Sequence, residues 1–271
     1  MKELYDQKSW LAIRGGSVPH AIFKVAGVNH YAIEPDELHI IFLGVLQYMI
    51  GSVLWLLVFR ILERSPKENL DRIWSKIIEY YRGHAVSVQY SSLSISSFCS
   101  ESSPDSHYPR LKGKGAELRD VLAPTAEAWS TLVPDDYDMK ADIFELLKRQ
   151  LHCQDILHDY RHDYFLPVPE VNALRAHIGA GLLLYQKLAA RADRDAELLF
   201  SQPTKFHWMW HLGERAMYLS PRLSNTMMDE DFVGRMKELV QACSAGTELD
   251  NMALKAIEKY RYGFDFISKW R

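Results

Sequence analysis

Residues Ile40 to Phe59 carry no charged side chain, and this segment constrains the fold more than any other part of the sequence. It reads IIFLGVLQYMIGSVLWLLVF, a length of about twenty mostly apolar residues that is close to what a bilayer-spanning helix needs. Gln47 and Ser52 interrupt the run, and charged residues flank both of its ends. A core helix that is buried on all sides has the same composition. The sequence therefore leaves two alternatives, a buried core helix and a membrane span, and favours the first.

Start and stop signals predict a mainly helical chain. Pro35 followed by two acidic residues predicts a helix over 36–63. Ser65-Pro66-Lys67-Glu68 has the pattern of a capping box and predicts a second helix that ends at Gly83. Apolar residues at steps of three and four then predict helices near 116–131, 138–161, 168–193, 203–218, 228–243 and 247–262.

The middle of the chain differs from these helical segments. Residues 84–97 alternate apolar and polar side chains, which predicts a strand. A polar stretch over 98–115 predicts a flexible surface loop between an N-terminal part, 1–97, and a helical domain, 116–271. The expected fold class is mainly α, a helical bundle-like domain with little β structure.

Composition narrows the function. The chain of 271 residues is 48% hydrophobic and 25% charged, which is typical of a globular protein. Its formal net charge of -3 lacks the basic excess that usually accompanies nucleic-acid binding, so any such surface must be local. Three widely spaced cysteines form neither a disulfide framework nor a zinc-finger pattern, and the N-terminus lacks the pattern of a signal peptide. These features indicate an intracellular protein.

Two histidine patterns are candidate sites. Asp36 and His39 are three residues apart and share one face at the start of the apolar helix, although an acidic first turn with one histidine is the more common explanation of such a pattern. His207 and His211 have the i, i+4 spacing that lets two imidazoles share a metal ion. Trp208 stands where an HExxH zinc protease needs its glutamate, which excludes that class. The alternative for this pair is an aromatic core helix with hydrogen-bonded histidines.

Two further clusters carry metal-ligand chemistry. Asp229, Glu230 and Asp231 open a predicted helix, where the helix dipole favours acids and where a carboxylate could bind a hard cation. His158 and His162 are also four residues apart, in a segment whose mixed charges equally fit a solvated helix. P-loop, Rossmann and GxSxG patterns are absent from the sequence.

The order of these motifs resembles a known family. The string Asp36-Glu37-Leu38-His39 opens an apolar helix that contains Gly44, His211-Leu212 follows much later, and Glu230-Asp231-Phe232-Val233-Gly234-Arg235-Met236-Lys237 comes after a polar stretch. This succession resembles the CACTA-type (EnSpm-like) cut-and-paste DNA transposases. The resemblance covers roughly 36–60 and 205–243, and the Glu230 string is its most specific part.

The resemblance implies a ribonuclease H-like catalytic domain with a large helical insertion. In that family, carboxylates hold two metal ions, normally Mg²⁺, that activate water and stabilise the leaving 3′ oxygen. It implies that Glu230 is the last carboxylate, that Asp36 is a ligand or supports one, and that His39 orients Asp36. Lys205 and His211 lie in the segment that matches the family's His-Leu helix. DNA as a partner, homo-oligomerisation and a nuclear location follow from the same resemblance.

The sequence also departs from the family pattern. The first catalytic aspartate is expected on a strand upstream of Asp36, and residues 1–35 offer only Asp6, outside any strand pattern. We therefore expect a truncated or degenerate transposase relative that is inactive alone. The sequence leaves two other classes of protein open. One is a membrane-anchored helical protein with a span at 40–59, and the other is a soluble helical interaction protein without catalysis.

Overall fold

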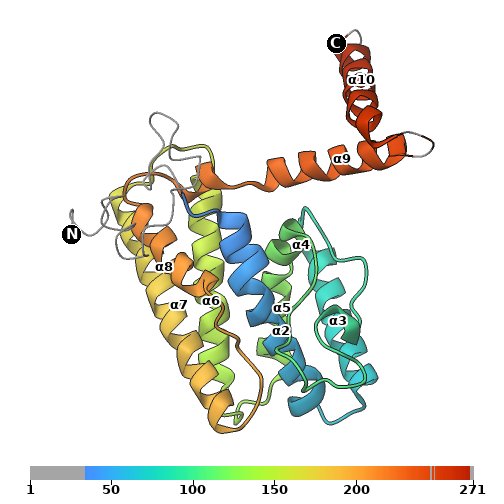
Figure 1. Ribbon diagram of the computed structural model, residues 1–271. Helices are drawn as coiled ribbons and strands as arrows, with labels where there is room; N and C mark the ends of the chain where they lie inside the picture. Colours follow the sequence, from blue (N-terminus) through green and yellow to red (C-terminus); the bar gives the residue numbers. More distant parts are fainter. Residues whose placement is uncertain (1–33, 245, 247, 269–271) are drawn as a thin grey trace, which may run out of the picture. The chain divides into compact units, whose positions relative to one another are not determined.

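The computed structural model describes residues 34–244, 246 and 248–268 (Figure 1). The chain divides into two compact units, Met1–Ser224 and Asn225–Arg271. Within the described ranges the structure consists of helices joined by turns and loops, and it contains no strand. This confirms the mainly helical fold class. The polar loop over 98–115 lies inside the first unit.

The apolar segment forms one long helix from Leu38 to Ile61, close to the predicted 36–63. It has three consecutive stretches: η4 (Leu38–Leu46) and η5 (Leu56–Ile61) are π-helical, and α2 (Gln47–Trp55) between them is α-helical. Leu43 departs from helical geometry with φ -87° and ψ 18°. Wide π-type turns arise where a carbonyl leaves the regular hydrogen-bond ladder, and they recur near functional sites.

Other helices of the first unit surround this apolar helix (Figure 1). The helix passes the length and composition test for a membrane span, yet 89% of its most apolar window is buried inside the protein. A core helix of this kind passes the same test, so the membrane alternative gains only weak support. Its buried side chains point in all directions and include Leu46, Ile50, Val53 and Leu56, each 0% exposed.

The surrounding helices pack in a defined order. α3 (Pro66–Gly83) contacts η5, α4 (Gly115–Asp120) contacts η4, and α5 (Leu122–Leu132) contacts α2 and α3. α6 (Lys140–Asp159) and α7 (Val168–Arg194) lie side by side, and α8 (Lys205–Arg215) packs on both α7 and η4 (Figure 1). In the second unit, α9 (Met227–Ser244) packs on α10 (Leu249–Ser268).

The predicted start of α3 is confirmed in detail. The Ser65 hydroxyl accepts a hydrogen bond from the Glu68 backbone N–H, and the Glu68 carboxylate accepts one from the Ser65 N–H at 3.1 Å. This reciprocal pair satisfies two of the donors that a helix N-terminus otherwise leaves free. The capping signal is local, and for that reason it could be recognised from four residues alone.

The strand predicted over 84–97 is wrong. These residues run as irregular backbone, with a single short 3₁₀ turn, Ile95–Ser97, at the end. Alternate side chains still turn inward, and Tyr90 is buried. The Val88 N–H donates to the Asp120 carboxylate at 3.0 Å instead of to a neighbouring strand. The alternation of apolar and polar residues shows only which side chains face the helices. Here a side-chain carboxylate accepts the backbone hydrogen bond that a neighbouring strand would accept in a sheet.

Part of the loop over 98–115 is packed rather than free. The Leu111 side chain is 0% exposed, and its backbone N–H donates to the Gln47 carbonyl at 2.9 Å. A Cβ on Gly51 would lie 2.7 Å from the backbone of Pro109, so only glycine permits this approach of loop and helix. The prediction of a flexible surface segment is therefore wrong for this stretch, since it forms part of the cover over α2.

Candidate functional site

The first predicted site residues, Asp36 and His39, meet at the start of η4. One carboxylate oxygen of Asp36 accepts the Leu38 backbone N–H at 3.0 Å, and the other accepts that of His39 at 3.3 Å. The second oxygen also contacts Nδ1 of the His39 ring. Asp36 therefore stabilises the free donors of the helix terminus and holds the imidazole at the same time.

Two more acids flank this pair, and each has a cationic partner. Glu34 pairs with Arg215 of α8 at 2.5 Å, and Glu37 pairs with Arg222 at 3.0 Å. The Glu37 side chain is only 2% exposed, so it depends on that partner, because a buried carboxylate without a counter-charge is strongly disfavoured. These pairs join the start of η4 to the chain that leaves α8.

Lys205, a residue of the predicted His-Leu helix, also reaches this end of η4. Its Nζ donates to the carbonyl of Leu43 at 2.7 Å, at the non-helical residue of the π-helical stretch. Gly44 admits the lysine, since a Cβ there would lie 2.8 Å from Lys205 Cδ. Burial lowers the pKa of Lys205, and nearby Arg110 lowers it further, while Asp36 opposes the shift. The structure thus brings Lys205 close to Asp36.

No family model, curated protein or solved structure matches this chain.

Glu230, the last predicted carboxylate, lies in α9 of the second unit. The side chains of Met228, Asp229, Glu230 and Asp231 fall outside the described residues. Asp36 belongs to the first unit. Among the side chains that are described, no group of three or more histidines, cysteines or acids is placed to hold a metal ion.

The described acids around Asp36 do not by themselves fit a Mg²⁺ site. Glu34 and Glu37 are held by Arg215 and Arg222, and Asp36 is held by two backbone N–H groups and His39. Hard divalent cations require several carboxylate or carbonyl oxygens directed at one point. A metal ion at Asp36 would therefore need an additional carboxylate.

The second histidine pair is formed as its spacing predicts. His207 and His211 lie on α8 with their Nε2 atoms 2.9 Å apart. Burial lowers the pKa of His211, with smaller contributions from His207 and Arg215. By contrast, α6 ends at Asp159, so His162 lies beyond the helix that carries His158. His158 and His162 therefore do not share a helical face.

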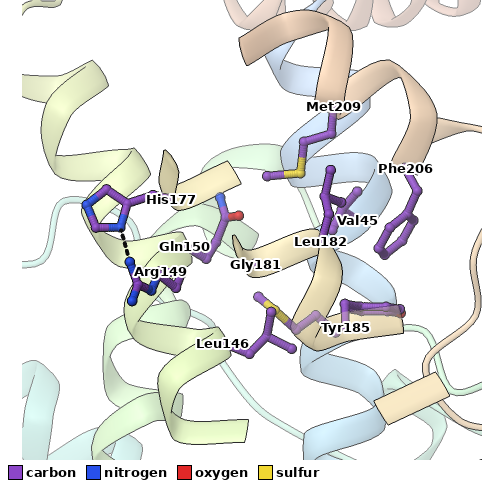
Figure 2. Close-up of a pocket in the computed structure, with 11 residues that line it drawn as sticks. Val45, Leu146, Arg149, Gln150, His177, Gly181, Leu182, Tyr185, Phe206 and Met209 are labelled. Carbon is purple, nitrogen blue, oxygen red and sulfur yellow. Dashed lines mark hydrogen bonds between the residues drawn. The ribbon is translucent and has the colours of Figure 1, made fainter. Parts of the chain in front are cut away.

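Sequence reasoning missed a small cavity between α6, α7, α8 and the apolar helix. Figure 2 shows Gln150, Leu182 and Met209 among the side chains that surround it. Gln150 is 5% exposed, and its Nε2 has no hydrogen-bond partner in the described structure. The cavity volume of about 10 Å³ accommodates one water molecule at most. The sequence did contain one sign of this cavity: Gln150 stands at a position of α6 where the helical repeat predicts a buried apolar residue.

A larger cavity of about 200 Å³ lies at the other end of the apolar helix. Its lining includes Trp55 and the ion pair of Arg60 with Glu197. Two nearby residues, Ala196 and Phe200, adopt left-handed backbone angles with φ of 57° and 54°. No motif in the sequence pointed to this place, because its residues come from three separate segments, 55–60, 104–105 and 196–199.

Proposed function

We propose that this chain is a transposase-derived protein, the remnant of a two-metal domain for DNA strand cleavage and transfer, and that it is inactive alone. The observation that carries the proposal is the contact between the Asp36 carboxylate and His39 Nδ1 at the start of the apolar helix. The resemblance implies that His39 orients Asp36, and this contact supports that role. A long helical region follows, as an insertion between Asp36 and Glu230 requires.

The same cluster supports the loss of activity. Three cationic side chains, those of Lys205, Arg215 and Arg222, contact residues 34–43. Arg215 and Arg222 form ion pairs with the acids on either side of Asp36. Like charges nearby weaken the binding of a divalent cation by Coulomb repulsion. In the proposal, Asp36 and Glu230 are the carboxylates retained from the family's metal ligands, and Mg²⁺ is the ion that they bind.

Manganese binding tests the proposal, because Mn²⁺ has oxygen-ligand preferences like those of Mg²⁺ and is paramagnetic. We would titrate Mn²⁺ into the full chain and follow free Mn²⁺ by electron paramagnetic resonance. Asp36→Asn and Glu230→Gln should each weaken binding at least about tenfold, a loss of about 1.4 kcal/mol. Asn remains a good helix cap, so Asp36→Asn changes charge with little change in stability.

Asp71→Asn is the matched control, since Asp71 is an exposed acid on α3. Equal Mn²⁺ binding by all four proteins, or none by the wild type, would contradict a residual metal centre. The helical interaction protein would then be the better interpretation. Exposed aromatic side chains favour that second candidate, notably Tyr164, Phe165 and Tyr218, at 68%, 67% and 75% exposure.

A further inference from the structure

The exposed side of α8 carries a preformed pair of imidazoles. His207 and His211 are one helical turn apart, and their Nε2 atoms lie 2.9 Å from each other. Their ring planes cross at 87° with centroids 4.4 Å apart. His207 is exposed and His211 half-buried, so an ion in solvent reaches the pair. The pair is separate from the cluster at Asp36 and does not depend on the proposed function.

We propose that His207 and His211 form a binding site for a divalent transition-metal ion, with Ni²⁺ or Cu²⁺ preferred over Zn²⁺. With metal–nitrogen distances of about 2.05 Å, two nitrogens 2.9 Å apart subtend about 90° at the ion. Neighbouring ligands subtend this angle in octahedral and square-planar coordination, which are the geometries that Ni²⁺ and Cu²⁺ adopt. A tetrahedral Zn²⁺ site would require nitrogens about 3.3 Å apart.

The protonation state of the pair suits metal binding. Ligation uses neutral imidazole, the form in which one Nε2–H can donate to the other Nε2. In the metal-free protein, one Nε2–H donates to the other Nε2. On binding, the donor ring carries its proton on Nδ1 in place of Nε2, and rotation of the two side chains directs both Nε2 lone pairs at the ion, with no net release of a proton.

The charges around the pair are already engaged. The Glu214 carboxylate is held by the Arg175 guanidinium at 2.7 Å and 2.9 Å. Arg215 is held by Glu34. Water fills the remaining coordination positions of the ion.

Nickel titration of the untagged full chain tests this site, followed by isothermal titration calorimetry at neutral pH. The wild type should bind one Ni²⁺ through these residues, and it should bind Zn²⁺ more weakly. His207→Gln and His211→Gln should each reduce the Ni²⁺ affinity at least about tenfold. The double variant should lose this binding event. Trp208, whose ring lies 5.7 Å from that of His211, should show Ni²⁺-dependent fluorescence quenching that the double variant lacks.

The matched control is the double variant His158→Gln, His162→Gln. It has the same spacing in sequence, but the end of α6 at Asp159 separates its two residues. It should bind Ni²⁺ like the wild type. An unchanged Ni²⁺ affinity in the His207 and His211 double variant would overturn the proposal, as would loss of binding in the control. Preference for Zn²⁺ over Ni²⁺ would overturn the geometric argument.

Discussion

Lys205 of α8 donates a hydrogen bond of 2.7 Å to the carbonyl of Leu43, 162 positions earlier in the chain. Leu43 is the residue at which the apolar helix leaves helical geometry. Its carbonyl therefore accepts a side-chain hydrogen bond at the distortion of the helix. This single contact joins α8 to the buried helix and brings a cation to the neighbourhood of Asp36.

Replacement of Lys205 by methionine should destabilise the first unit. Methionine keeps the apolar stem of the side chain but leaves the Leu43 carbonyl without this donor, which costs about 1–2 kcal/mol. The free energy of unfolding from urea denaturation measures the effect. Lys67→Met, at an exposed lysine of α3, should change it by less than about 0.5 kcal/mol. Equal effects of the two substitutions would contradict the role of the hydrogen bond.

Gly44→Ala should also destabilise the fold. The added Cβ would lie 2.8 Å from the His39 carbonyl oxygen and from Lys205 Cδ. Overpacking of this kind costs about 1–3 kcal/mol. Gly83→Ala is the control, because a Cβ there meets nothing within 4 Å and alanine favours the helix. The two substitutions should therefore shift the melting temperature in opposite directions, and a neutral Gly44→Ala would show that the contact relaxes freely.

Asn69→Asp should be among the most damaging single substitutions in the first unit. The Asn69 side chain is buried, and its Nδ2 donates at 2.9 Å to the carbonyls of Val58, Leu62 and Arg64. A carboxylate there would oppose three carbonyl oxygens in a buried place, which costs about 3 kcal/mol or more. The soluble yield and urea midpoint report the loss. Asp71→Asn on the exposed face of the same helix should leave both unchanged.

Asp120 should make stability depend on acidic pH. Burial acts to raise the pKa of Asp120, but hydrogen bonds from Arg119, Ser87 and Val88 prevail and hold it below its ordinary value. A depressed carboxyl pKa stabilises the fold above the unfolded-state pKa, and this contribution disappears as pH falls through the folded-state pKa.

Asp120→Asn should therefore lower the free energy of unfolding by about 1 kcal/mol at neutral pH. The difference from the wild type should stay constant down to about pH 5 and shrink below about pH 4. Urea denaturation over this pH range measures it. A difference that grows on acidification would contradict the depressed pKa.

The sequence by itself determined the elements whose signals are local. Ser65 and Glu68 cap α3 as predicted, because both partners lie within four residues. The apolar run over 40–59 correctly predicted a helix. The spacing of His207 and His211 correctly predicted that the two side chains meet, because residues four apart lie on the same face of an α-helix. In each case the necessary information lies within one or two helical turns.

The tertiary structure alone decided the remaining features. Alternation over 84–97 could not distinguish a strand from irregular chain laid on helices, because Asp120 from a later helix replaced the ladder partner of Val88. Likewise, the sequence contained no sign that Arg215 and Arg222 would pair with Glu34 and Glu37. Such contacts join residues far apart in sequence, and they form only after burial of the apolar helix has paid the entropy cost of bringing those segments together.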